Sequence, residues 1–149
     1  MSGADPIYFP NVESSDWMAM SMPEGDSFDA RLDPYQFRKV AAGKAEALFE
    51  TNSGSQNGQN GLHGGFLAAR AEQVLYLPLY VNRSVALGRV VIIDMNLQYV
   101  AGGTVGVPLL AEVELIQETG RMGFTRGLLK QEGRVLTSFT STIRKLPEA

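Results

Sequence analysis

One stretch of helical spacing, residues 64–77, lies between two stretches of strand character, and this order restricts the folds open to the chain. Leu67, Ala71 and Val74 recur at intervals of three and four residues, which places them on one face of a helix. Pro78 follows, and because a proline ring clashes with the preceding turn, we expect the helix to end near it. The chain therefore offers one long helix.

The segment before the helix has the pattern of a β-hairpin. Residues 35–41 and 44–51 flank a short turn that contains Gly43, and apolar and polar residues alternate in the second run. Residues 52–61 are rich in Asn, Ser and Gly, which indicates a loop that leads directly into the helix.

Four runs of strand character follow the helix. They span residues 89–100, 108–117, 122–130 and 135–145. Because they are joined by turns, we expect an antiparallel meander that brings the sheet to about six strands. One amphipathic helix and one long antiparallel sheet share a core only if the sheet wraps the helix, so the prediction is an α+β fold with a central helix.

The first 34 residues have a different character, because several prolines interrupt them. Their apolar side chains include Trp17, Met18, Met20 and Met22. We expect residues 1–34 to form an N-terminal arm that docks these side chains on a single domain formed by residues 35–149. A flap over a substrate tunnel is the alternative.

Composition excludes several classes of function. The chain has no cysteine and one histidine, which excludes disulfides, thiolate metal sites and multi-histidine metal sites. A net charge of −3 disfavours nucleic-acid binding. No apolar run reaches the roughly 18 residues of a membrane span, and the N-terminus lacks the pattern of a secretory signal. We therefore expect a cytoplasmic protein with no metal, no membrane and no nucleic-acid partner.

The start of the helix is the densest group of candidate functional residues. Asn57, His63, Gly64 and Gly65 lie within nine positions. The first amides of a helix have no internal partner, and a carbonyl oxygen placed at Gly64 or Gly65 would be polarised as in an oxyanion hole. The alternatives are glycines that give room for packing, a capping histidine and a turn asparagine.

Glu72 lies on the same helix, among the small and aromatic neighbours Ala68 and Tyr76. Partial desolvation there would raise the pKa of the carboxyl group towards the range useful for a base or nucleophile. The alternative is an exposed glutamate paired with Arg70 or Arg83.

Helix geometry separates these two groups. Glu72 follows Gly64 by eight residues, which is roughly 12 Å along the axis at 1.5 Å per residue. One substrate carbon cannot contact both in a single chain. An antiparallel pair of such helices would bring Glu72 of one chain to the helix start of the other, so we expect a homodimer with two composite sites.

The chain resembles the hotdog-fold acyl-CoA thioesterases, of the phenylacetate-degradation type and the glutamate-using 4-hydroxybenzoyl-CoA type. The resemblance rests on Asn57-x5-His63-Gly64-Gly65, on Glu72 nine positions after the histidine, and on the run Asp94-Met95-Asn96-Leu97-Gln98-Tyr99. It extends over residues 35–145.

The resemblance implies a role for each residue of the motif. The N–H of Gly64 would polarise the thioester carbonyl and His63 would position it. Glu72 of the partner chain would attack the carbonyl or activate a water that Asn57 orients. No cofactor is needed, and a dimer of dimers is an open possibility.

It also implies a substrate pocket, whose candidate residues are Gly65, Phe66, Tyr76 and Tyr99. Glutamate at position 72 favours an aromatic acyl group. The chain departs from its relatives at Asn60, where many have glycine, and at Tyr76, where some have a serine or threonine. The serine or threonine hydroxyl that would assist the carboxylate of Glu72 in some relatives is therefore absent at position 76.

Two other functions remain open. Hotdog-fold hydratases and dehydratases also pair a histidine with a carboxylate, although in other sequence contexts. A non-catalytic acyl-CoA-binding dimer is the third reading, but sensors of that kind usually carry an output module, for which residues 1–34 are short and acidic.

Overall fold

The computed structural model describes residues 16–20 and 25–148, so Met22 and the first prolines lie outside the described part. Its elements are β1 (Met18–Met20), α1 (Phe28–Arg31), β2 (Tyr35–Ala41), β3 (Lys44–Phe49), η2 (Ser53–Ser55), α2 (Gly64–Val74), α3 (Leu77–Val81), β4 (Val90–Tyr99), β5 (Leu109–Glu118), β6 (Met122–Gln131) and β7 (Arg134–Lys145).

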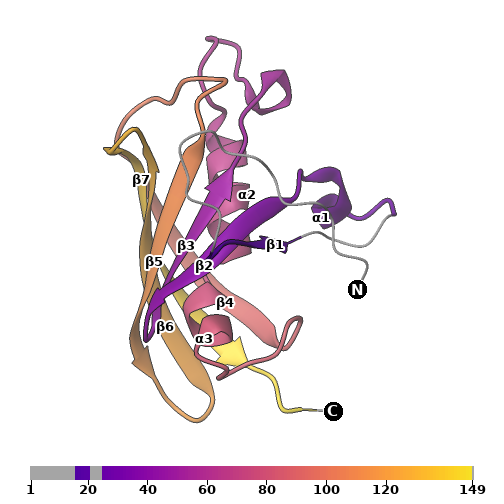
Figure 1. Ribbon diagram of the computed structural model, residues 1–149, viewed down its shortest axis with the longest axis vertical. Helices are drawn as coiled ribbons and strands as arrows, with labels where there is room; N and C mark the ends of the chain where they lie inside the picture. The colour runs from indigo at the N-terminus through magenta and orange to yellow at the C-terminus, as the bar shows by residue number, and fades with distance from the viewer. Residues whose placement is uncertain (1–15, 21–24, 149) are drawn as a thin grey trace.

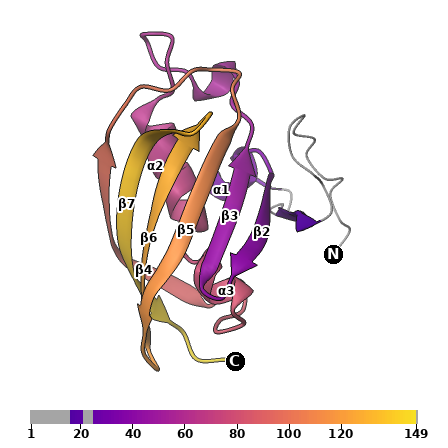
Figure 2. The same cartoon turned by 60° about the vertical axis from the view of Figure 1, so that its left-hand side comes forward.

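A single antiparallel sheet with the strand order β1-β2-β3-β5-β6-β7-β4 curves around α2 (Figures 1 and 2). This confirms the predicted α+β class and the wrapped central helix of the hotdog fold. The sheet has seven strands rather than about six, because residues of the N-terminal arm pair with β2 as β1. The Gly43 hairpin is present as β2 and β3.

The expected four-strand meander is wrong in its first member. β4 pairs with β7 at one edge of the sheet, and β5 pairs with β3 near the middle. The physical reason is the length of the connection: residues 100–108 can carry the chain across the sheet, whereas the short turns around β6 keep β5, β6 and β7 adjacent.

The expected end of the helix also needs correction. α2 ends at Val74, and Pro78 lies in the first turn of the short helix α3 instead of terminating the long one. Proline is well tolerated there, because the N–H groups of a first helical turn have no intrahelical acceptor. Within the described residues, no helix is long and apolar enough to cross a membrane.

The core lies between α2 and the inner face of the sheet. Leu67, Ala71 and Val74 are buried there, as the helical spacing predicted. Gly127 of β6 makes room for a core aromatic side chain, because a Cβ at this position would overlap the ring of Phe139. The packing of α2 on the sheet fixes which face of the helix points away from the core.

The described part of the N-terminal arm is attached to the sheet edge. Met20 is buried, the guanidinium of Arg38 lies 4.6 Å from the ring centroid of Trp17, and Met18 is exposed. Ser27 caps α1 by accepting a hydrogen bond from the N–H of Ala30 at 3.1 Å. α1 lies before β2 in the chain and to the right of α2 in the view of Figure 1.

Candidate active site

Asn57 organises the loop that leads into α2. Its Oδ1 accepts hydrogen bonds from the N–H groups of Gln59 and Gly61 at 2.8 and 2.9 Å, and its Nδ2 donates to the carbonyl of Leu62 at 3.4 Å. The side chain therefore holds the backbone of its own loop. In this chain Asn57 would therefore influence a reaction first by positioning the loop residues that follow it.

Asn60 adopts a backbone conformation that usually favours glycine. Its φ of 65° lies in the left-handed region, which glycine adopts freely and asparagine tolerates better than most residues. Asparagine is therefore compatible with this turn of the loop.

His63 is the N-cap of α2. Its Nδ1 accepts the N–H of Gly65 at 2.8 Å. Within residues 16–20 and 25–148, the N–H groups of Gly64 and Phe66 have no hydrogen-bond acceptor. Of the two glycine amides considered from the sequence, the one at Gly65 is occupied by His63, and the one at Gly64 has no acceptor among the described residues.

Tyr99, at the end of β4, lies against this helix start. Its hydroxyl donates to the carbonyl of Gly64 at 3.0 Å. A Cβ at position 64 would lie 3.3 Å from Cζ of the Tyr99 ring, so glycine gives the ring room to approach. The structure thus brings together two predicted site residues that are 35 positions apart.

Glu72 lies on the outer side of α2 and is exposed on the single chain. Partial desolvation and the negative charge of Asp29 nevertheless raise the pKa of its carboxyl group. Among the described residues no cation forms an ion pair with it, because Arg70 bonds elsewhere. Asp29 lies 43 positions before Glu72, so local spacing in the sequence does not relate the two residues.

Tyr76 belongs to a cluster of tyrosines one turn beyond Glu72. It shares a hydrogen bond with Tyr35, whose hydroxyl also contacts the carbonyl of Gln73 at 3.3 Å. Burial is the main cause that raises the pKa of Tyr76. Its ring centroid lies 6.4 Å from that of Tyr80.

Phe66 lies on the opposite flank of the helix, against the buried Arg70, whose Cζ is 5.4 Å from its ring centroid. Both line a hollow of about 210 Å³ beside Arg31 and Asp33. Phe66, Tyr76 and Tyr99 therefore occupy three separate places on one chain.

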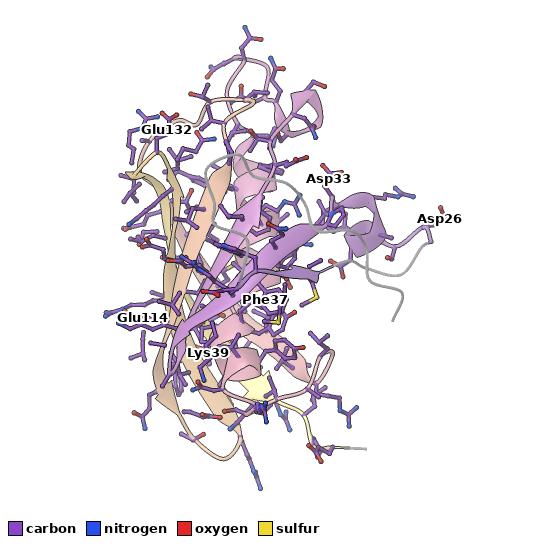
Figure 3. The ribbon with its side chains drawn as sticks, viewed as in Figure 1. Asp26, Asp33, Phe37, Lys39, Glu114 and Glu132 are labelled. Atoms are coloured by element: carbon purple, nitrogen blue, oxygen red, sulfur yellow. The ribbon has the colours of Figure 1, made fainter. Side chains whose placement is uncertain are left out.

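A larger hollow of about 440 Å³ contains none of the predicted site residues. It lies on the outer face of the sheet, where Glu114 points away from α2 (Figure 3). Ion pairs between Glu112 and Lys130, and between Glu114 and Arg126, cross this face. We assign no part of the reaction to it.

The sequence profile of the thioesterase superfamily matches residues 59–138, more than half of the chain and including Gly64, Glu72 and Tyr99. The chain belongs to this superfamily. No curated protein matches the sequence.

Solved structures of thioesterases share the fold of this superfamily member. The zebrafish thioesterase superfamily member 2 is 19% identical, with a TM-score of 0.69 over 82% of this chain and 88% of that one. A hypothetical thioesterase protein from Streptococcus pneumoniae with coenzyme A is 17% identical, with a TM-score of 0.68 over 76% and 87%. A variant of the phenylacetic acid degradation protein PaaI from Thermus thermophilus is 23% identical, with a TM-score of 0.65 over 75% and 93%.

Proposed function

We propose that this protein hydrolyses an acyl-CoA thioester to a free acid and CoA. The observation that carries the proposal is the N–H of Gly64 at the start of α2, which has no acceptor among the described residues, in a thioesterase-superfamily chain whose Glu72 lies on the outer side of the same helix. The amide would stabilise the oxygen of the thioester carbonyl as negative charge develops on it.

Glu72 supplies the nucleophilic part of the reaction. Its carboxylate either attacks the carbonyl carbon, so that the C–S bond breaks and an anhydride forms for water to hydrolyse, or removes a proton from a water that attacks directly. In both routes one water is consumed, and the sulfur leaves as the thiolate and takes up a proton. A carboxyl group with a raised pKa is a better base than an ordinary glutamate at neutral pH.

We infer that each site combines two chains. Gly64 and Glu72 lie roughly 12 Å apart along one helix, which is too far to contact the same carbon. β4 supports a homodimer, because one of its edges has no partner strand in residues 16–20 and 25–148, and the apolar side chains of Val91, Ile93 and Tyr99 are exposed on this strand. Two copies related by a two-fold axis would cover this edge, and two such dimers could associate further.

For the substrate we propose an aromatic acyl group on CoA. The use of glutamate at position 72 favours it, and the similar structures include one determined with coenzyme A and one from phenylacetic acid degradation. Tyr99 beside Gly64 offers an exposed ring on which an aromatic acyl group can pack.

The first experiment measures release of free CoA thiol from acetyl-, hexanoyl-, palmitoyl-, phenylacetyl- and 4-hydroxybenzoyl-CoA. We expect the aromatic thioesters to turn over fastest and Glu72→Gln to lose about a thousandfold in kcat. Hydration of an enoyl-CoA without thiol release would instead indicate a hydratase, and saturable CoA binding without turnover would indicate a binding protein.

Mixing two inactive variants tests the composite site. Gly64→Pro removes the amide hydrogen at a helical position where proline is well tolerated, and Gly64→Ala adds a Cβ while keeping that hydrogen. If the site combines two chains, refolded mixtures of Glu72→Gln and Gly64→Pro should regain about a quarter of wild-type activity, since half of the dimers carry one intact site. Mixtures that stay inactive would contradict this arrangement.

A further inference from the structure

Among the described residues, Arg70 of α2 is the one charged side chain that is buried, with 1% of its surface exposed. Its Nη1 donates to the carbonyl of Asp33 at 2.9 Å and to Oε1 of Gln73 at 2.8 Å, and both acceptors are uncharged. No carboxylate of the described chain forms an ion pair with it. Buried charges are ordinarily paired, so the bonds of Arg70 within the chain are incomplete.

The incomplete part is one edge of the guanidinium group. The two hydrogens of Nη1 are used by its two bonds, whereas Nε–H has no acceptor and Nη2 makes no hydrogen bond in residues 16–20 and 25–148. Nε and Nη2 share the edge opposite Nη1 and present two parallel N–H groups. This is the fork that binds the two oxygens of a carboxylate.

The surroundings of Arg70 fix where this edge points. Its Cζ lies 4.7 Å from the ring centroid of Phe49 and 5.4 Å from that of Phe66, so aromatic rings pack on the group. Nη1 is turned to Gln73, which lies further along α2. The opposite edge is therefore turned back towards Phe66 and the loop before α2. Burial lowers the pKa of Arg70 to about 10, which leaves the group charged at neutral pH.

A hollow of about 210 Å³ lies on this side of Arg70. Its apolar side chains are Leu32, directly after α1, and Phe66, and its polar ones include Asn52 and Ser55 of the loop. An apolar cavity of roughly 150 Å³ is large enough for benzene. The hollow therefore has room for one ring or a short alkyl chain together with a carboxylate.

The charges around the hollow restrict the kind of anion. Arg31, Asp33 and Glu50 line it and are exposed, so two carboxylates stand against one cation outside the buried Arg70. The carboxylate of Asp33 accepts a hydrogen bond from Nδ2 of Asn52 at 3.2 Å. These carboxylates repel a dianion such as phosphate more strongly than a singly charged acid. An inorganic ion would also make no use of the apolar side chains.

We propose that this hollow is a binding site for a small monocarboxylic acid with an apolar body. The carboxylate lies on the Nε–Nη2 edge of Arg70, and the body packs on Phe66 and Leu32. The site is separate from the Gly64 amide and from Glu72, and it does not depend on their assignment. The acid released in the proposed reaction belongs to this class of ligand, and that link alone rests on the proposed function.

The first test observes Arg70 directly. The ¹H–¹⁵N signal of its Nε–H, assigned by its absence in Arg70→Lys, is followed while phenylacetate, benzoate or hexanoate is added to the full-length protein. We expect this signal to move and then saturate, because the N–H gains a charged acceptor. Benzyl alcohol, which lacks the carboxylate, and inorganic phosphate, which lacks the apolar body, should leave it in place.

Variants test whether the hollow is the place of binding. Arg70→Lys keeps the charge but loses the fork, and calorimetry should show phenylacetate binding weakened roughly tenfold. Leu32→Trp keeps Arg70 and fills the hollow, so it should abolish binding even if Arg70→Lys does not fold. Leu87→Trp, at an exposed position that does not line the hollow, is the matched control and should bind as the wild type does.

The outcomes separate this site from the catalytic one. An Nε–H signal that no acid moves would overturn the proposal and leave Arg70 as an anchor of the arm only. Binding that survives in Leu32→Trp, or that disappears in Glu72→Gln, would place the acid elsewhere and overturn it as well. Thiol release is measured independently: a protein that binds phenylacetate at Arg70 but hydrolyses no thioester would refute the proposed function and retain this site.

Discussion

The two flanks of α2 are built in opposite ways. The flank that faces the arm is locked, because the guanidinium of Arg70 bonds to Gln73 at 2.8 Å and to the carbonyl of Asp33. The other flank presents Gly65, Ala68 and Glu72, which are small or exposed, and within the described chain it has no comparable bonds. The locked flank fixes the orientation of the helix, and the open flank is left for a substrate and a second chain.

This difference predicts an order of effects on the free energy of unfolding. Substitutions on the locked flank should cost most, those at the helix start less, and a substitution on the open flank almost nothing. Turnover should follow a different order, because the open flank carries the chemistry.

Arg70→Met should have the largest effect on stability, a loss of about 3 kcal/mol. The change leaves the carbonyl of Asp33 and the side chain of Gln73 without a donor and removes the guanidinium from the face of Phe49. Urea denaturation measures the loss, with the exposed Lys39→Met as the matched control. An equal, small loss in both variants would show that the flank is not locked.

Asn57→Ala should cost about 1–2 kcal/mol, because the N–H groups of Gln59 and Gly61 lose their shared acceptor. Turnover should fall with it, since the loop positions His63 and Gly64. Asn57→Asp keeps the acceptor and serves as the control, which should retain most of the stability. If the two variants unfold alike, the Oδ1 bonds do not hold the loop.

Tyr99→Phe should cost about 0.5–1 kcal/mol, the net value of one hydrogen bond to the carbonyl of Gly64. The ring remains, so packing against Gly64 is kept and kcat should change only severalfold. Comparison with Tyr99→Leu separates the hydroxyl from the ring: an equal loss of activity in both would assign the effect to the hydroxyl alone.

Glu72→Gln should change the free energy of unfolding least, by less than about 0.5 kcal/mol, because the side chain is exposed and has no ion pair among the described residues. We expect a loss of turnover without a loss of stability, and this result would distinguish the two flanks of α2 most clearly. A destabilised variant would mean that Glu72 is a structural residue after all.

Much of the fold could be predicted from periodicity. The helix face of Leu67, Ala71 and Val74 and the hairpin at Gly43 follow from local spacing, and both are present. The position of β4 could not be predicted, because strand pairing depends on how a nine-residue connection crosses the sheet rather than on the strand itself. β1 could not be predicted either, because a strand of three residues is too short to show an alternating pattern.

The candidate site likewise has some features that local sequence predicts and others that it does not. That residues 57–65 form one loop and helix start follows from their nearness in sequence, and the free Gly64 amide follows from helix geometry. The occupation of the Gly65 amide by His63 depends on a rotamer, and the hydrogen bond from Arg70 to the carbonyl of Asp33 depends on the path of the arm. Neither leaves a periodic trace in the sequence.

The strand order has a consequence for how the protein is made. Among the described residues, β4 pairs with β7 alone, and β7 is synthesised after β5 and β6. Synthesis of the 46 residues that follow Tyr99, up to Lys145, takes several seconds at roughly 5–20 residues per second. During that interval both hydrogen-bonding edges of β4 are unpaired. Nascent chains on one messenger RNA are therefore exposed to each other through β4, the same strand that we infer to join the finished protomers.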